Sequence, residues 1–182
     1  MEIISTDFKD LLIIKNKIFS DLRGVFFESF HESNFRVQSG LNISFVQDNT
    51  SLSSRNVLRG LHYQIPPKGQ AKLITVLRGS VLDVVVDLRL HQPTFGKVFT
   101  MHLSSENYNQ LFIPEGFAHG FYSLEDDTLF SYKCSNYYSP QHERCIRWNS
   151  SGLEIPWPGD APLVSAKDDM GIDFVDYAGE FF

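Results

Sequence analysis

Apolar and polar residues alternate along much of this chain with a period of two, which is the period of a β-strand. The pattern is strictest at 80–89, where Leu82, Val84, Val86 and Leu88 would share one face. Further strands are predicted at 11–19, 25–30, 42–49, 57–64, 71–78, 95–103, 111–123 (broken by a turn at 114–116) and 128–138. Helical periodicity is almost absent, and only a short helical turn is predicted, at 31–37.

Turn signals separate these strands. Gly24 closes a hairpin turn that begins at Ser20, and a Pro-Pro-Lys-Gly turn at 66–69 joins two neighbouring strands. A polar loop is predicted at 50–56, and the chain beyond Tyr138 becomes rich in proline and tryptophan. Many short strands joined by such turns indicate an all-β fold, either a sandwich or a jelly-roll barrel, with short helical turns and an irregular C-terminal wrap.

Composition limits the classes of function that remain. With 182 residues, 42% of them hydrophobic, the chain is long enough for one well-buried core, and we expect a single domain over 1–182. Its net charge is −6 and its basic residues form no run, which argues against a nucleic-acid surface. A small phosphate-bearing ligand needs only a few well-placed Arg and Lys side chains, so it remains possible.

The cysteines and the N-terminus indicate the compartment. Cys134 and Cys145 have neither the spacing of a zinc site nor a disulfide-rich context. The first ten residues are acidic and the apolar run 11–14 is too short for a signal peptide, and no segment is long enough to span a bilayer. We therefore expect a soluble, cytoplasmic protein with no membrane partner.

A cluster of ionisable residues at 57–72 is the strongest candidate for a site. It carries Arg59, His62 and Lys72 on two predicted strands. Alternation places His62 on one face of its strand and Arg59 on the other, and Lys72 can lie across from the first strand if both belong to one barrel. A single histidine would more often be a hydrogen-bonded core residue, but the cluster favours a functional site.

Other polar residues lie on predicted strands. Gln47 and Asn49 would share one side of a strand, where their amides could bind the carbonyl and NH groups of a ligand. Tyr132 would share a face with buried residues. Asp83 and Asp87 also share a face, which would lie toward solvent or toward the cavity, and solvent is the more usual environment for such carboxylates.

Most catalytic classes lack their signature here. The closely spaced histidines and glutamate of metal-binding jelly rolls are missing, as are a Gly-x-Ser-x-Gly nucleophile motif and a glycine-rich phosphate loop. What remains is His, Lys, Tyr and Asp without metal or cofactor. These residue types are suited to proton transfer next to a carbonyl group.

Eight motifs, in order and with matching spacing, cover about residues 10 to 170. They are Asp21-Leu-Arg-Gly-Val-Phe-Phe-Glu28, Gln47-Asp-Asn49, Leu58-Arg-Gly-Leu-His-Tyr-Gln64, Gln70-Ala-Lys72, Gly79-Ser-Val-Leu-Asp-Val-Val-Val-Asp-Leu-Arg89, Pro114-Glu-Gly-Phe-Ala-His-Gly-Phe121, Tyr132-Lys and Trp157-Pro. Through these motifs the chain resembles the dTDP-4-dehydrorhamnose 3,5-epimerases. The resemblance implies a cupin-type jelly roll, usually a homodimer, that works without metal or cofactor on a dTDP-sugar. The reaction would invert C3 and C5 of dTDP-4-dehydro-6-deoxy-D-glucose to give dTDP-4-dehydro-L-rhamnose.

The same resemblance assigns catalytic roles. It implies that His62 is the base, that Asp168 orients its imidazole, that Lys72 stabilises the enolate oxygen and that Tyr132 returns a proton from the opposite face. The neighbouring Asp169 is the alternative partner of His62.

The resemblance also implies a set of substrate-binding residues. They are Arg23, Glu28, Gln47, Asn49, Arg59, Lys72, His119, Glu143 and Lys167. Phe26 or Tyr138 could stack on the thymine ring. Three other functions stay open: an epimerase that acts at C3 only, a 3,4-ketoisomerase on a related nucleotide sugar, and a non-catalytic sugar-binding cupin.

Overall fold

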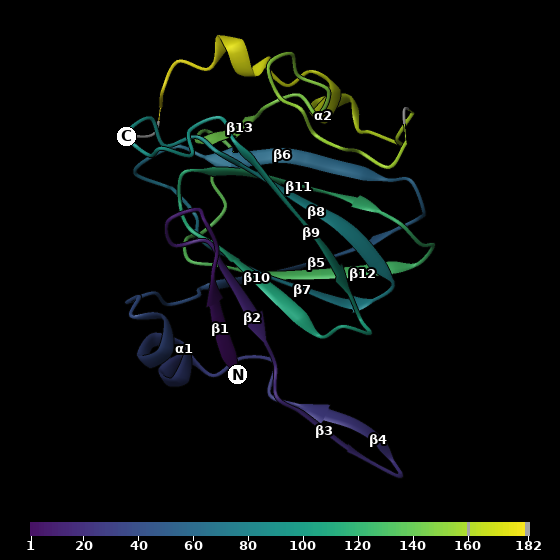
Figure 1. The fold of residues 1–182 in the computed structure, drawn as a ribbon. Helices are drawn as coiled ribbons and strands as arrows, with labels where there is room; N and C mark the ends of the chain where they lie inside the picture. The colour runs from purple at the N-terminus through teal and green to yellow at the C-terminus, as the bar shows by residue number, and fades with distance from the viewer. Residues whose placement is uncertain (160, 181–182) are drawn as a thin grey trace.

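Two antiparallel β-sheets face each other in the computed structural model, which describes residues 1–159 and 161–180 (Figure 1). One sheet has the strand order β1-β2-β10-β7-β12-β5 and the other has the order β13-β6-β11-β8-β9. The strands of the first sheet are β1 (Glu2–Ser5), β2 (Leu12–Lys15), β10 (Asn109–Ile113), β7 (Lys72–Arg78), β12 (Thr128–Cys134) and β5 (Gln47–Ser53). Those of the second are β13 (Glu143–Cys145), β6 (Leu58–Gln64), β11 (Phe117–Ser123), β8 (Ser80–Asp87) and β9 (Val98–Ser104). The predicted all-β jelly-roll barrel is confirmed.

Three apolar clusters hold these layers together. The first fills part of the space between the two sheets and includes Phe121 and Phe130, whose stacked rings lie 4.0 Å apart. The second lies between the five-stranded sheet and the C-terminal segment, and the third lies between the six-stranded sheet and helix α1 (Glu32–Ser39). Phe35 of α1 is fully buried and packs against Phe112, which explains why a short helix with little helical periodicity is retained.

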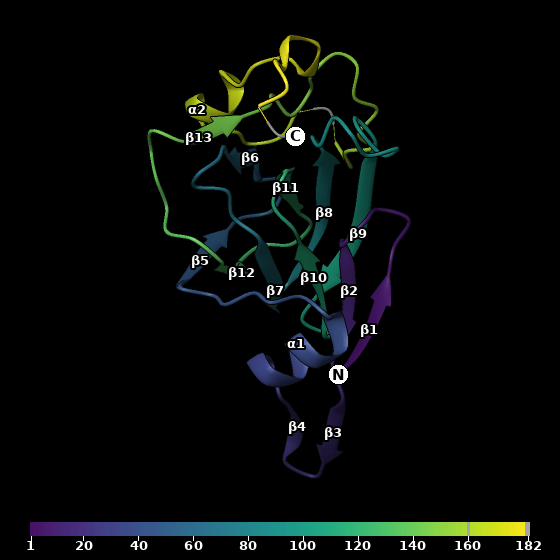
Figure 2. The ribbon, with the colours of Figure 1, turned by 90° about the vertical axis from the view of Figure 1, so that its left-hand side faces the viewer.

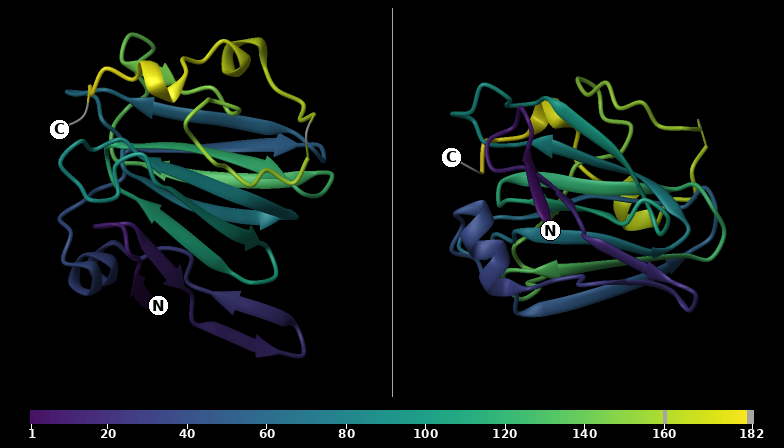
Figure 3. Two further views of the ribbon diagram at one scale, coloured as in Figure 1. Left: turned by 45° about the horizontal axis from the view of Figure 1, so that its top comes forward. Right: turned by 60° about the horizontal axis from the view of Figure 1, so that its bottom comes forward.

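The C-terminal segment covers the outer face of the five-stranded sheet, as the left panel of Figure 3 shows. It contains helix α2 (Ala166–Asp169) and a 3₁₀ turn, η1 (Phe174–Asp176). Two isolated parallel bridges, Val57 to Leu163 and Ile146 to Ile172, attach it to the barrel. The predicted irregular wrap is therefore an ordered layer with its own backbone hydrogen bonds.

A separate hairpin of β3 (Ile18–Asp21) and β4 (Gly24–Phe27) projects away from the barrel in two perpendicular views (Figures 1 and 2). Its apolar side chains are poorly covered: Phe26 is 70% exposed and Leu22 is fully exposed. Exposed apolar side chains concentrated on one element are typical of interaction surfaces. Across 1–159 and 161–180, no helix combines the length and the apolar character needed to cross a bilayer.

Both ends of β5 differ from the sequence prediction. β5 begins at Gln47 and continues to Ser53, so its second half lies in the segment predicted as a polar loop. The polar residues of β5 led to the prediction of a loop, but every second one faces the space between the sheets. There the chain pairs with β12 in unbroken register, from Gln47 opposite Cys134 to Ser53 opposite Thr128. Helix α1 confirms the helical turn predicted at 31–37.

A bulge in β6 overturns the predicted alternation around His62. His62 pairs with His119 and Arg59 with Phe121, so two residues of β6 lie opposite the single residue Gly120. The extra residue brings Arg59 and His62 to the same cavity, although alternation had placed them on opposite faces.

Glycine is required at this bulge. Gly60 has a φ of +121°, and a Cβ there would lie 2.6 Å from both Gly120 Cα and His119 O. We expect Gly60→Ala to lower the free energy of unfolding by roughly 3–5 kcal/mol, from backbone strain and overlap together. Gly40→Ala is the control: Gly40 has a φ of +71° but open space around it, so its cost should be about 1 kcal/mol. Denaturant unfolding of both variants measures the difference, and equal losses would contradict the overlap.

Candidate active site

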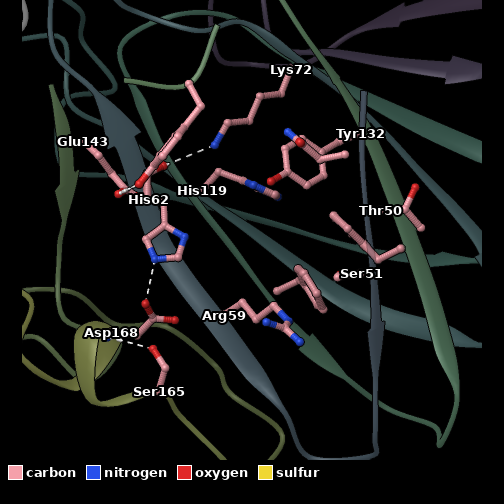
Figure 4. A pocket seen from close by; sticks show the side chains of 14 residues that line it. Thr50, Ser51, Arg59, His62, Lys72, His119, Tyr132, Glu143, Ser165 and Asp168 are labelled. Atoms are coloured by element: carbon pink, nitrogen blue, oxygen red, sulfur yellow. Dashed lines mark hydrogen bonds and ion pairs between the residues drawn. The ribbon is translucent and has the colours of Figure 1, made fainter. Parts of the chain in front are cut away.

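A cavity of about 350 Å³ lies between the two sheets, with α2 on one side (Figure 4). The side chains that line it come from six strands, from α2 and from the loops beside them. They are Asn49, Thr50, Ser51, Arg59, His62, Lys72, His119, Phe121, Phe130, Tyr132, Tyr138, Glu143, Ser165 and Asp168. Most of the residues that the sequence singled out are therefore brought together.

His62 and Asp168 form a hydrogen-bonded pair at the centre of the cavity wall. Nε2 of His62 lies 2.7 Å from Oδ1 of Asp168, and the other carboxylate oxygen accepts the backbone N–H of Gly60 at 3.1 Å. Burial raises the pKa of Asp168, but its hydrogen bonds to His62 and Gly60 outweigh this, so the pKa lies below its ordinary value. Because an ionised carboxylate only accepts, Nε2 carries the ring proton and Nδ1, which Figure 4 shows on the cavity side, holds the free lone pair.

Ser165 supports Asp168 from within the same segment. Its hydroxyl caps α2 by accepting the backbone N–H of Asp168 at 3.1 Å. Asp168 is buried and points at His62, whereas Asp169 is exposed. Of the two adjacent carboxylates, Asp168 is thus the one that contacts His62.

Lys72 lies in the wall of the cavity that β7 forms. Its Nζ is 3.5 Å from the backbone oxygen of His62 and 5.9 Å from the ring centre of Tyr132. The side chain is buried, and burial lowers the pKa of its ammonium despite the partly offsetting Asp83 and Glu143. Among the described residues no carboxylate forms an ion pair with Lys72, so its protonated amine is suited to stabilise negative charge on a ligand.

Tyr132 faces the cavity from β12, in the sheet opposite to His62. Burial raises the pKa of its phenol, and the hydrogen bond to Asn49 offsets this only in part. The hydroxyl therefore keeps its proton at neutral pH and can donate it. The cavity thus places a proton acceptor on one sheet and a proton donor on the other.

His119 lines the cavity and pairs with Asp83 behind it, with Nε2 and Oδ2 3.0 Å apart. Burial lowers the pKa of His119 although Asp83 opposes this, so the imidazole is neutral at neutral pH. Of the two environments expected for Asp83 and Asp87, solvent and the cavity, solvent is wrong. Both are fully buried: Asp83 holds His119, and Asp87 binds Arg89 and Thr94. Each buried carboxylate has a specific partner, which makes the burial tolerable.

Arg59 and the inward face of β5 form one end of the cavity. Nε of Arg59 donates to Oγ of Ser53 at 3.2 Å, which aims the guanidinium into the space between the sheets. Gln47 and Asn49 lie on the same face, hydrogen-bonded to each other at 3.0 Å, as alternation predicted. Together these residues offer one cation and several amide and hydroxyl groups to a polar ligand.

The mouth of the cavity is held by Glu143. The hydroxyl of Tyr138 donates to its carboxylate at 2.6 Å, and Lys167 of α2 forms an ion pair with the same oxygen. Burial raises the pKa of Glu143, but Lys167 and Tyr138 outweigh this and hold it below its ordinary value. Lys167 contacts Glu143 and is absent from the cavity wall itself.

Arg23, Glu28 and Phe26 do not join the cavity. They lie on or beside the β3–β4 hairpin, where Arg23 is exposed and ion-paired with Asp21 at 2.5 Å. Within one chain, this part of the expected binding set is therefore separated from the rest (Figure 1).

Sequence reasoning missed several residues of the cavity: Thr50, Ser51, Phe121, Phe130 and Ser165. Two signals could have found some of them. A serine three residues before an acidic residue, as in 165–168, is the signature of a helix N-cap. Extending the alternation of β5 past Asn49 would have placed Ser51 on the same face.

Comparisons with known proteins place the chain in one family. The sequence profile of the family described as dTDP-4-dehydrorhamnose 3,5-epimerase matches residues 5–176. The dTDP-4-dehydrorhamnose 3,5-epimerase of Shigella flexneri is 49% identical over 176 residues, which cover 97% of each chain. The crystal structure of dTDP-4-dehydrorhamnose 3,5-epimerase from Elizabethkingia anophelis has a TM-score of 0.92 and 46% identity, with 97% of each chain covered. A dTDP-6-deoxy-D-glucose-3,5-epimerase from Legionella pneumophila, solved in complex with dTDP-4-keto-L-rhamnose, has a TM-score of 0.90 and 46% identity over 94% of this chain and 92% of that one.

Proposed function

The chain belongs to the dTDP-4-dehydrorhamnose 3,5-epimerase family, and we propose that the cavity between its two sheets is where the epimerisation takes place. The enzyme is an isomerase that converts dTDP-4-dehydro-6-deoxy-D-glucose to dTDP-4-dehydro-L-rhamnose. The observation that carries the proposal is the placement of a base and an acid on facing sheets, His62 on one and Tyr132 on the other. Inversion of a carbon needs one group on each of its faces.

The ketone at C4 makes the chemistry possible. Both C3 and C5 are next to it, so the loss of a proton from either carbon gives an enolate whose charge lies mainly on oxygen. Nδ1 of His62 takes the proton, and Asp168 keeps the imidazole in the required tautomer. The Lys72 ammonium stabilises the enolate oxygen, and the Tyr132 phenol returns a proton from the opposite face. No step requires a metal or an organic cofactor.

The nucleotide part of the substrate would occupy the end of the cavity beside β5. Arg59 provides the charge for the diphosphate, and the amides of Gln47 and Asn49 suit the polar edges of the base. Tyr138 lies beside Gln47, whose side-chain oxygen accepts the Tyr138 backbone N–H at 2.9 Å, so this ring can stack on thymine. His119 and Glu143 line the cavity nearer to His62 and would contact the sugar, and Lys167, paired with Glu143 at the mouth, would approach it from outside the cavity wall. The complex of the Legionella pneumophila epimerase with dTDP-4-keto-L-rhamnose supports a dTDP-sugar as the ligand here.

A second copy of the chain would complete the site. The β3–β4 hairpin carries Arg23 and Glu28 away from its own barrel and exposes apolar side chains such as Phe26. A two-fold dimer would bury those side chains and bring both charged residues to the partner's cavity. The proposal is therefore a homodimer in which each cavity uses residues of both subunits.

Proton NMR in D₂O tests the reaction directly. Purified protein and dTDP-4-dehydro-6-deoxy-D-glucose should exchange deuterium into C3 and C5, with formation of dTDP-4-dehydro-L-rhamnose, after treatment with a chelator. Deuterium at C3 alone would show a C3-only epimerase, and migration of the ketone to C3 would show a 3,4-ketoisomerase. Binding without any exchange would leave a sugar-binding cupin.

Activity should also fall at alkaline pH because of Lys72. The pKa of this ammonium is lowered by burial, so it loses its proton, and the enolate loses its cation, at a lower pH than for an ordinary lysine. The pKa of Tyr132 is raised, so Tyr132 is not the cause of this decline. The pH profile of deuterium exchange should keep the alkaline decline in Tyr132→Phe and lose it in Lys72→Arg, whose cation does not titrate in this range. A profile that is flat at alkaline pH in the wild type would contradict the role of Lys72.

A further inference from the structure

We propose that the His62–Asp168 pair and Cys145 form a binding site for a thiophilic divalent cation such as Zn²⁺, and that an ion bound there inhibits the enzyme reversibly. The inhibition rests on the role of His62 given above, whereas the binding itself does not. Among the described residues, these three are the group whose ligand atoms, imidazole nitrogen, thiol sulfur and carboxylate oxygen, all lie within 4.8 Å of one another.

The fold holds the three side chains on a rigid frame. Cys145 of β13 pairs directly with His62 of β6, and residues that pair directly in an antiparallel sheet project to the same face. Asp168 reaches the pair from α2, which Ser165 caps, and the bulge at Gly60 anchors one of its carboxylate oxygens. The Cys145 sulfur lies 3.9 Å from the backbone oxygen of Asp168, which keeps it beside the pair.

The donor set matches zinc. Zn²⁺ binds cysteine sulfur at about 2.3 Å and histidine nitrogen or carboxylate oxygen at about 2.0–2.2 Å, so ligand atoms in a tetrahedral site lie roughly 3.3–3.8 Å apart. Small side-chain rotations would move the present atoms to those separations. His62 and Asp168 line the cavity, from which water can supply the fourth ligand, and the partly buried Cys145 and the 30% exposed His62 side chain give an ion access.

Charge around the site is mixed. The carboxylates of Asp168 and Glu143 attract a cation, although Glu143 is already paired with Lys167. Arg59 and Lys72, which line the cavity, repel a cation. The thiol must give up its proton to solvent when the metal binds. The sulfur and imidazole donors favour thiophilic ions over Mg²⁺ and Ca²⁺, which prefer oxygen ligands.

Binding would remove the catalytic base. In the free protein Nε2 of His62 carries the ring proton and Nδ1 holds the lone pair. A metal on Nε2 requires the neutral ring to carry its proton on Nδ1, so the proton moves by way of solvent from one nitrogen to the other. The ring then has no lone pair left to accept the substrate proton.

Co²⁺ gives a readout that is independent of catalysis, since a thiolate bound to tetrahedral Co²⁺ produces charge-transfer absorption in the near ultraviolet. The wild type should show this band with one equivalent of Co²⁺, and Zn²⁺ should abolish it. Cys145→Ala and Cys145→Ser should lack the band. Cys134→Ala is the matched control, because Cys134 is buried on β12, outside this group, and it should keep the band.

Inhibition is measured on the same proteins. Zn²⁺ should stop deuterium exchange in the wild type and in Cys134→Ala, with recovery on adding a chelator. Cys145→Ala and Cys145→Ser should need at least tenfold more Zn²⁺ for the same inhibition. A missing Co²⁺ band in the wild type, a band that survives both Cys145 substitutions, or equal inhibition of all variants would overturn the site. If no variant exchanges deuterium, the proposed reaction fails and the Co²⁺ band still decides the metal site.

Discussion

His62→Asn should lower the rate of deuterium exchange at both C3 and C5 by at least about 10³-fold, in the range expected when a general base is removed. Asparagine keeps the polarity and approximate size of the side chain but has no lone pair on nitrogen to accept a proton. Exchange is the informative measurement because it reports proton abstraction even where no product accumulates.

Tyr132→Phe should separate abstraction from inversion. The base and the enolate-stabilising cation remain, so deuterium should still enter both carbons. Without a donor on the opposite sheet, His62 returns the proton to the face from which it was taken, and dTDP-4-dehydro-L-rhamnose should form at least about 10²-fold more slowly. If Tyr132→Phe lowers the rates of deuterium exchange and of inversion equally, one group performs both steps.

Asp168→Asn tests the orienting carboxylate. Its amide nitrogen can donate to His62, which would favour the tautomer with the proton on Nδ1 and leave no base on the cavity side. Asp169→Asn is the matched control, because Asp169 is exposed, and it should retain full exchange. If the two substitutions have equal effects, Asp168 is not the residue that orients His62.

Two inactive variants should restore activity in a mixed dimer. The first, Arg23→Ala with Glu28→Ala, has an intact cavity but a defective hairpin, and the second, His62→Asn, has an intact hairpin but no base. We expect each homodimer to be at least about 100-fold less active than wild type, since truncated charge contacts to a ligand commonly cost several kcal/mol. In a mixed dimer, the intact hairpin of the second subunit enters the intact cavity of the first. Activity should return to about half of the wild-type value, because one of two sites is complete.

The mixed dimer is obtained by co-expression with two different affinity tags and sequential purification. If the hairpin served its own cavity, no subunit of the mixed dimer would hold a complete site, and no activity would return. A monomeric wild type in sedimentation experiments would equally contradict the exchange of hairpins. As a control, wild type paired with His62→Asn should also reach half activity, since the wild-type cavity then receives an intact hairpin.

The sequence alone determined the class of fold and the chemistry. Strict alternation in β8 and its neighbours identifies strands with one apolar face, and turn residues limited each strand to a short length. The motifs around His62, Lys72 and Tyr132 identified groups for proton transfer, since those residue types and their spacing are local properties of the chain.

The tertiary structure decided which of these groups meet. Arg59 lines the same cavity as His62 only because two residues of β6 lie opposite the single residue Gly120. The alternation of apolar and polar residues cannot reveal such an inserted residue. Asp83 is buried because His119 arrives from another strand to pair with it, and Asp168 is distinguished from Asp169 by the direction in which α2 faces. Periodicity describes a strand by itself, whereas register, burial and pairing depend on residues distant in sequence, and these contacts assemble the site.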